Sequence, residues 1–308
     1  FAADHQRYFG PHSENITLVG QKLTGTVERI AGEGHPDIEQ VVYGDTDSVM
    51  IDMDVPDDVT VDEAIEVGKR ISADIEAEMQ EWAEGRGAFS EFLTLDVDDI
   101  YDRFYIGDKK KRYFGHRVFD GAPCDNFKVR GFETRQGNWP RPVRDFQEEL
   151  MHALLDDEPT APIIDEARDK LFSGEWDMEM ATSTKLGQPV DEYDPPMPHS
   201  RAAKQIRSHH GQSAIQVGDK VDYVKYAKGG DQIAWIYDGE IGISFRPNDG
   251  YCHECEKVVR EDGHPHDTEE YPHFRSEHYS YLWDKKFVSV MDSIGVTEGE
   301  QSGLGDFL

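Results

Sequence analysis

The sequence has few cysteines, few basic residues and no long apolar run. Only three of its 308 residues are cysteines, which is too few for a disulfide framework and typical of a reducing compartment. No stretch approaches the roughly 18 consecutive apolar residues of a membrane span, and the N-terminus lacks the basic and apolar pattern of a signal peptide. We therefore expect a cytoplasmic protein that has no membrane partner.

Acidic residues outnumber basic ones by about two to one. The chain has 63 Asp and Glu against 32 Lys and Arg, a formal charge of -31, yet 37% of its residues are hydrophobic, which is enough for packed cores. Uniform negative charge would repel nucleic acid. The basic residues are concentrated, however, because residues 109–144 hold 10 basic and 3 acidic residues whereas residues 52–99 hold 3 basic and 16 acidic. We expect the surface of an extreme halophile or its virus; an ordinary acidic protein is the alternative.

The spacing of apolar residues predicts an α+β fold. Residues 14–31 have the period of an amphipathic helix, and Thr60 with Glu63 forms a capping box before another helix of about twenty residues. An antiparallel sheet with packed helices should therefore be followed by a mostly helical second half. The strands are predicted at residues 39–43, 48–53, 92–106, 112–119 and 127–135, and the later helices at residues 143–155 and 163–171.

Two carboxylates lie at the tip of the first predicted hairpin. The string Tyr43-Gly44-Asp45-Thr46-Asp47-Ser48 joins two apolar strands. Oxygen ligands suit Mg²⁺, and rigid strands can hold paired carboxylates at the spacing that two-metal phosphoryl transfer needs. A solvated Asp-rich turn is the alternative, because acid-x-acid triplets are frequent by chance in so acidic a chain.

The segment VVYGDTDSVMI resembles motif C of the family B, or alpha-type, DNA polymerases. The resemblance implies a palm sheet in which Asp47 bridges two Mg²⁺ ions and Asp45 is the second acid of the motif. Downstream, LDVDDIY at residues 95–101 is similar to the segment that carries an accessory palm carboxylate, with Asp98 as the candidate. All three residues would then be catalytic.

The basic island matches further segments of the same family. Lys110-Lys111-Arg112-Tyr113 resembles the element that grips the primer end through the minor groove, where cations meet phosphate and an aromatic ring braces the sugar. A solvated turn is the alternative. Segment 130–139 resembles the palm segment that leads into the thumb, with Arg130 as a further DNA-binding residue.

The second half of the chain contains a segment similar to a thumb helix. In PHSRAAKQIRSHHGQ at residues 198–212, three basic residues recur every three positions and share one helix face, which could follow the duplex backbone or be merely solvated. Residues 217–230 are similar to the thumb strand that follows. The basic residues are Arg201, Lys204 and Arg207.

A Cys/His cluster and the C-terminal tail lie outside these segments. Cys252-x2-Cys255-x8-His264-x-His266 has donors suited to structural Zn²⁺, with His253 and His273 as spare candidates. Two reduced thiols in a His-rich loop are the alternative. The tail of residues 301–308 resembles the sliding-clamp-binding peptide, in which an apolar plug is presented beside a hydrogen-bonding Gln; a frayed tail is the alternative. The clamp-binding residues would be Gln301, Leu304, Phe307 and Leu308.

These resemblances predict three regions and a function. Residues 1–143 would be the C-terminal part of the palm, with residues 1–34 leading from the fingers; residues 144–300 would be the thumb, with a zinc insertion at 250–275, and residues 301–308 the clamp-binding tail. The implied activity is addition of a deoxynucleotide (dNTP) to the 3′-OH of a primer–template. Motif A, the fingers and the exonuclease are expected in an N-terminal portion of the same polymerase, so these residues should be inactive alone. A catalytically dead DNA- and clamp-binding remnant and a Mg²⁺-dependent nuclease are the alternatives.

Overall fold

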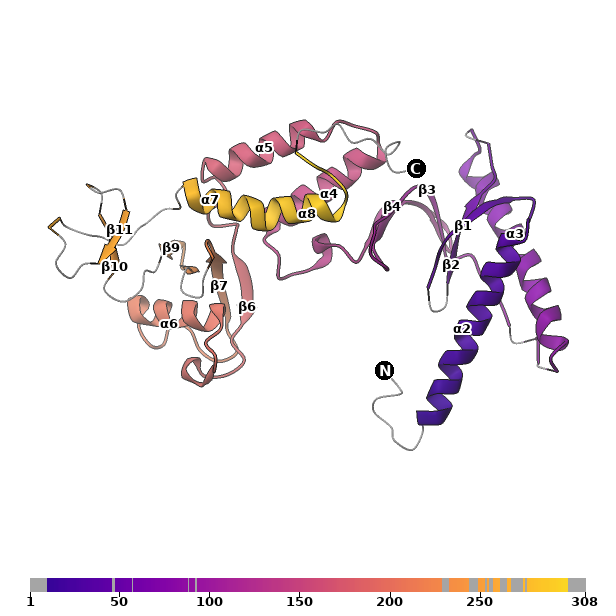
Figure 1. The fold of residues 1–308 in the computed structure, drawn as a ribbon, viewed down its shortest axis with the longest axis horizontal. Coiled ribbons are helices and arrows are strands. Elements are labelled where there is room, and N and C mark those ends of the chain that lie inside the picture. Colours follow the sequence, from indigo (N-terminus) through magenta and orange to yellow (C-terminus); the bar gives the residue numbers. More distant parts are fainter. Residues whose placement is uncertain are drawn as a thin grey trace. The chain divides into compact units, whose positions relative to one another are not determined.

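The fold is known from a computed structural model, in which the chain forms two compact units (Figure 1). One unit comprises residues 1–104 and 115–128, and the other comprises residues 105–114 and 129–308. The division passes through the middle of a three-stranded sheet. The structure describes residues 10–45, 48–56, 58–87, 89–91, 93–228, 233–243, 249–252, 254, 257–260, 265–266, 274 and 276–298.

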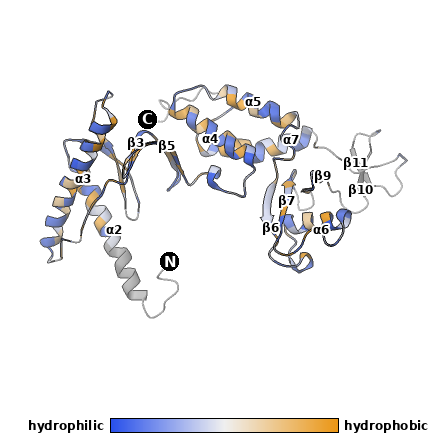
Figure 2. Ribbon diagram, turned by 180° about the vertical axis from the view of Figure 1, so that it is seen from behind, coloured by the Kyte–Doolittle hydropathy of each residue, from blue (hydrophilic) through white to orange (hydrophobic). Residues whose placement is uncertain are grey.

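In the first unit, two long helices pack on a hairpin. Helix α2 (Gly10–Gly32) contacts helix α3 (Val61–Glu84) and the antiparallel pair β1 (Ile38–Gly44) and β2 (Val49–Met53). The buried faces of these elements form one apolar cluster, which includes Val27, Ile30, Ile71 and Ile75. Figure 2 shows both hydrophobic and hydrophilic residues along α3, and its buried residues Ile71, Ile75 and Met79 recur every four positions, so they share one face of the helix.

The capping box predicted at the start of α3 is confirmed. The Thr60 hydroxyl accepts a hydrogen bond from the Glu63 N–H at 3.3 Å, and the Glu63 carboxylate accepts from the Thr60 N–H at 3.0 Å. These bonds satisfy backbone donors that the helix itself leaves open. The Thr60 hydroxyl also donates to the Glu63 carboxylate at 2.6 Å, and this bond, together with that from the Thr60 N–H, lowers the pKa of Glu63 because both favour the charged carboxylate.

A three-stranded sheet in the order β3–β4–β5 follows α3. Its strands are β3 (Asp99–Ile106), β4 (Tyr113–Asp120) and β5 (Pro123–Arg130). In the first unit, Ile100, Val118 and Phe119 bury their side chains with Ile65 of α3. The β4–β5 turn uses Gly121, whose φ of 67° favours glycine. The sequence predicted all three strands, although it placed the first too early and the last too late.

In the second unit, helices α4 (Arg141–Leu155) and α5 (Ala161–Phe172) share a core with the C-terminal helices α7 (Ser276–Leu282) and α8 (Val288–Ser293). A π-helical turn, η3 (Trp283–Phe287), joins α7 to α8. Phe287 is fully buried and packs edge-on against Phe146 of α4 with ring centroids 5.2 Å apart. Aromatic packing therefore ties the end of the chain to α4.

The second unit also contains a four-stranded antiparallel sheet covered by α6 (Pro198–His210). An apolar cluster formed by α6, β7 and β8 holds helix and sheet together, with Ile206 and Val221 fully buried. The sequence predicted α6 and one strand here, because the other strands are only four or five residues long. The strands, in order, are β6 (Thr182–Lys185), β7 (Lys220–Lys225), β8 (Ile233–Tyr237) and β9 (Glu240–Ile243).

The α+β fold class is confirmed, with antiparallel sheets and packed helices. The predicted boundaries at residues 143 and 300 describe functional regions, and they remain predictions. Within the residues that the structure describes, no helix is both long enough and apolar enough to cross a membrane.

Candidate functional site

The predicted carboxylate pair lies at the turn of the β1–β2 hairpin. Gly44 pairs with Val49 at the end of the ladder, and the Asp45 N–H donates to the Ser48 carbonyl at 2.9 Å, which closes the turn. The Asp45 side chain is partly buried. Asp47 lies outside the described residues. The sequence therefore placed the hairpin and its turn correctly, and the strands fix the backbone of Asp45.

Glu28 of α2 brings a further carboxylate to this turn. Its side chain lies so close to Gly44 that a methyl group added to Gly44 would overlap the Glu28 carboxylate. The absence of a side chain at Gly44 thus permits the approach of α2 to the residue before Asp45. Sequence reasoning missed Glu28, because an acidic residue in an amphipathic helix carries no signal by itself; the glycine before Asp45 was the available clue.

Asp98, the predicted accessory carboxylate, is exposed, and its neighbour Asp99 carries the ionic contacts. Asp99 accepts hydrogen bonds from Arg117 at 2.7 Å and from Lys128. Burial opposes the charge on Asp99, but hydrogen bonds from Lys128 and Arg117 outweigh it, so the pKa of its carboxyl lies below its ordinary value. Asp99 ties β3 to β4 and β5, whereas Asp98 is exposed.

The basic loop of residues 109–113 connects β3 to β4. The Arg112 N–H donates to the Lys109 carbonyl at 3.1 Å, and the Gly107 N–H donates to the Arg112 carbonyl at 2.9 Å. Lys110 and Lys111 are exposed, and Lys111 has a φ of 66°, in the left-handed region that few side-chain-bearing residues adopt. The two lysines are presented by a backbone that hydrogen bonds hold in one conformation. Tyr113, the last predicted residue of this element, begins β4 and is partly buried.

Gly131 lies directly against the backbone of this loop. It has a φ of 77°, and a methyl group in its place would overlap the carbonyl oxygen of Lys111. Arg130, the neighbouring predicted DNA-binding residue, ends β5 and is exposed. The close approach of two backbones therefore depends on the glycine that follows Arg130.

Arg112 is the one basic side chain of the loop that points into the protein. Its guanidinium donates to Glu133 at 2.9 Å and lies 5.3 Å from the centre of the Phe132 ring. The side chains of Arg112 and Glu133 are only 18% and 11% exposed. The pair therefore stands in a partly desolvated site, where each charge depends on the other.

Behind Arg112, a buried polar network reaches the C-terminal helix. Gln147 of α4 is fully buried, accepts a hydrogen bond from the Thr134 N–H at 3.0 Å, and donates to Glu133 at 2.9 Å and to Ser293 at 2.9 Å. We call Arg112, Glu133, Gln147 and Ser293 the loop-support network. It joins four sequence segments, so no local pattern could have predicted it.

The basic face of α6 is only partly open. Lys204 is exposed and lies 3.4 Å from Asp191, while the Arg207 guanidinium donates to the Ile215 carbonyl at 2.8 Å. Arg201 is partly buried on the same helix. The three residues share one helix, as predicted, but the Arg207 side chain is also hydrogen-bonded to Ile215, in the segment after α6.

Two of the four predicted zinc ligands, Cys252 and His266, are among the described residues, near the antiparallel pair β10 (Asp249–Cys252) and β11 (Lys257–Arg260). Cys252 ends β10 and pairs with Lys257 in the ladder, so the Cys-x2-Cys string begins at the hairpin turn. His266 forms an ion pair with Glu254 at 3.1 Å. Cys255 and His264 lie outside the described residues, as do the tail residues Gln301, Leu304, Phe307 and Leu308. In the part of the chain that the structure describes, no three His, Cys, Asp or Glu side chains are grouped to hold a metal.

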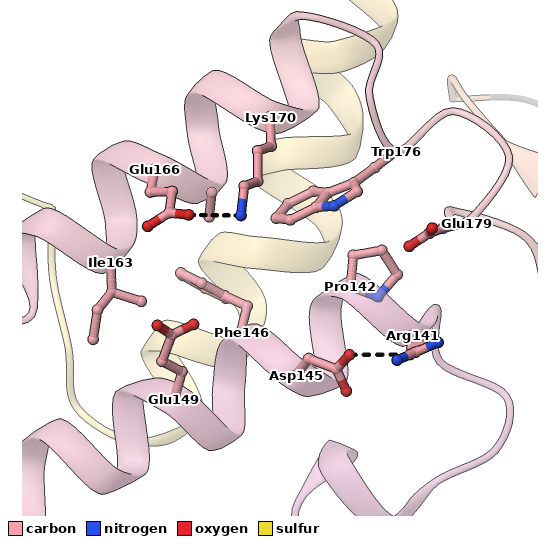
Figure 3. A pocket seen from close by; sticks show the side chains of 11 residues that line it. Arg141, Pro142, Asp145, Phe146, Glu149, Ile163, Glu166, Lys170, Trp176 and Glu179 are labelled. Atoms are coloured by element: carbon pink, nitrogen blue, oxygen red, sulfur yellow. Dashed lines mark hydrogen bonds and ion pairs between the residues drawn. The ribbon is translucent and has the colours of Figure 1, made fainter.

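A pocket of about 280 Å³ lies between α4 and α5, away from these residues (Figure 3). Arg141 pairs with Asp145 at 3.2 Å, and Lys170 pairs with Glu166 at 2.6 Å beside the Trp176 ring. The sequence did not predict this pocket, and none of the predicted site residues lines it.

Comparison with known proteins decides the family. The model of DNA polymerase family B matches residues 15–275, which span the hairpin, the basic loop and α6. The chain belongs to DNA polymerase family B. Its resemblance to that family is thus confirmed over most of its length.

Several DNA polymerases are similar to this chain. The DNA polymerase delta catalytic subunit of Glycine max is 27% identical over 229 residues, which cover 70% of this chain and 20% of that protein. DNA polymerase II of Escherichia coli is 28% identical over 210 residues, 64% of this chain and 25% of that protein. DNA polymerase 2 of Aeropyrum pernix is 28% identical over 216 residues, 69% of this chain and 23% of that protein. The chain spans only a fifth to a quarter of the length of these relatives.

Proposed function

We propose that this chain supplies the motif C carboxylates, the primer-binding loop and the thumb of a DNA-directed DNA polymerase. The observation that carries the proposal is the position of Asp45 at the closed turn of a β-hairpin, within the residues that match the family. The substrates would be a primer–template and a dNTP. Full activity would also require the carboxylate of motif A. From the resemblance to the family, we expect that carboxylate in an N-terminal portion of the same polymerase.

The donor set at the hairpin turn fits Mg²⁺. Asp45 offers carboxylate oxygens, the ligands that Mg²⁺ prefers, on a turn whose backbone is closed by a hydrogen bond. Asp47 would hold the metal with it, and Asp98 would be the accessory acid. Mg²⁺ held by these carboxylates would supply activation of the primer 3′-OH and neutralisation of the charge on the triphosphate.

The basic residues would divide into two roles. Lys110 and Lys111 are exposed and would contact the primer strand, with Tyr113 bracing its sugar. Arg112 faces Glu133 instead, so we assign it the role of holding the loop rather than binding DNA. Arg130, together with the basic face of α6, would follow the duplex.

Three finer features belong to the same proposal. The acidic surface would serve solubility in molar salt. Cys252, Cys255, His264 and His266 would hold structural Zn²⁺ at the β10–β11 hairpin, and the tail of residues 301–308 would bind a sliding clamp.

The test is affinity for a primer–template junction against single-stranded DNA, over a KCl series of roughly 0.5 to 3 M. We expect the chain to prefer the junction, and Lys111→Ala to weaken that preference severalfold. Absence of junction preference at every salt concentration would refute the primer-binding role and favour the catalytically dead remnant. Degradation of DNA with Mg²⁺ that Asp47→Ala abolishes would favour the nuclease instead.

A further inference from the structure

The pocket between α4 and α5 has the wrong charge for a phosphate ligand. Four carboxylates and two cations line it, so its formal balance is negative. Both cations are already held by a carboxylate of their own helix. Arg141 pairs with Asp145 at 3.2 Å, and Lys170 pairs with Glu166 at 2.6 Å. The pocket therefore presents negative charge to a group that enters it.

The other two carboxylates of the pocket lack a bonded counterion. Within the part of the chain that the structure describes, Glu149 and Glu179 form no hydrogen bond and no ion pair. The hydrogen bond to Glu166 is the main cause that raises the pKa of Lys170, and the charge of Glu149 is among the smaller ones. Both free carboxylates are exposed, and Figure 3 shows them with the Phe146 and Trp176 side chains between them. A cation that enters from solvent can therefore reach either carboxylate.

The wall between these carboxylates is apolar. Pro142 and Phe146 of α4 are buried, and Ile163 of α5 and Trp176 are partly buried. The Lys170 ammonium lies 5.7 Å from the centre of the Trp176 ring, so this aromatic wall already borders on a cation. The volume of about 280 Å³ lies just below the roughly 300–1,000 Å³ of ordinary small-molecule sites. A pocket of this size suits one large side chain with an alkyl stem and a charged end.

We propose that this pocket is a docking site for an arginine side chain of a partner protein. The stem would lie against the apolar wall, and the guanidinium would bond Glu149 or Glu179. Arginine fits better than lysine, because its planar group has five N–H donors and is weakly hydrated, so it can bond carboxylates while it packs against aromatic rings. A second copy of this chain is a poor partner, since two chains of charge -31 repel each other. The proposal is independent of the proposed function, because no DNA contact enters it.

The probe is N-acetyl-arginine N-methylamide, and the readout is NMR of the Trp176 indole N–H, assigned with Trp176→Phe. At the lowest salt concentration at which the protein stays folded, this single side chain should bind with a Kd of roughly 1–10 mM. Glu149→Gln and Glu179→Gln should each weaken binding by about 2- to 5-fold, the range for an exposed ion pair. Both variants should fold, because both side chains are exposed.

Two controls separate a specific site from a diffuse effect of charge. Glu148→Gln is the matched variant, since Glu148 precedes Glu149 on α4 but does not line the pocket, and it should leave the Kd unchanged. N-acetyl-citrulline N-methylamide has the shape of the arginine probe without its charge. It should bind several-fold more weakly to the wild-type protein.

Arginine binding that Glu149→Gln and Glu179→Gln weaken and Glu148→Gln does not supports the docking site. Equal affinity for the citrulline probe would overturn it, as would an equal loss of affinity in Glu148→Gln. Tighter binding of spermidine than of the arginine probe would overturn the assignment to a partner protein in favour of a free polyamine. A Trp176 signal that does not move with the arginine probe up to about 50 mM would show that the pocket binds no such side chain.

Discussion

Gln147→Leu tests the loop-support network most directly. The substitution keeps the volume of a fully buried side chain and removes its polar atoms. Glu133 then loses the hydrogen bond that Gln147 donates at 2.9 Å, and the Thr134 N–H loses its acceptor at 3.0 Å. A hydrogen bond to a charged group is worth about 1.5–3 kcal/mol, and a buried donor left without a partner costs about 1–3 kcal/mol.

We therefore expect Gln147→Leu to lower the free energy of unfolding by about 3 kcal/mol, measured by urea titration of the second unit. Ser293→Ala is the milder companion: it removes the hydroxyl's bonds to Gln147, Glu133 and the Val290 carbonyl but leaves Gln147 with Glu133, and it should cost about 1 kcal/mol. Gln136→Leu is the control, since Gln136 is exposed and its replacement should stay within about 0.5 kcal/mol. A loss below about 1 kcal/mol for Gln147→Leu would refute the network as a source of stability.

Two further predictions concern backbone strain and pH. Gly131→Ala should lower the free energy of unfolding by about 1–3 kcal/mol and should also weaken junction binding, because the added methyl group overlaps the Lys111 carbonyl. Gly121 has a similar φ but open space around it, so Gly121→Ala should lower stability and leave junction binding unchanged. The hydrogen bond between His116 and the Asp125 carboxylate raises the pKa of His116, so the stabilisation from this pair is complete below about pH 6.5 and disappears as the pH rises through the raised pKa. Urea titrations at about pH 6 and pH 8 should show a loss of about 0.5 kcal/mol in wild type that His116→Gln abolishes, and equal losses in both proteins would contradict this account.

The sequence predicted those parts of the site that depend on local pattern. The hairpin turn at Asp45 follows from two apolar strands around a Gly-Asp string, and α3 follows from a capping box and an apolar stripe. The role of Arg112 could not be predicted, because nothing in a run of four basic and aromatic residues distinguishes the side chain that faces inward. That distinction comes from Glu133, which lies 21 residues away.

The same limit applies to Glu28 and to the pocket between α4 and α5. Glu28 reaches the hairpin turn only because α2 packs along β1, and Glu149 and Glu166 line one pocket only because α4 packs against α5. Both contacts depend on tertiary packing, which spacing along the chain does not specify. Conversely, the short strands β6, β8 and β9 have four or five residues each, too few for a clear alternating pattern.

The loop-support network has a consequence for synthesis of the protein. Gln147 and Ser293, which share a hydrogen bond, are separated by 146 residues. A ribosome makes the basic loop well before α8, the helix that completes its support. Until then, the segment from Glu133 to Gln147 holds polar groups that lack their final partner. The nascent chain therefore acquires a basic loop of fixed shape only after Ser293 has been added, long after the loop itself has been made.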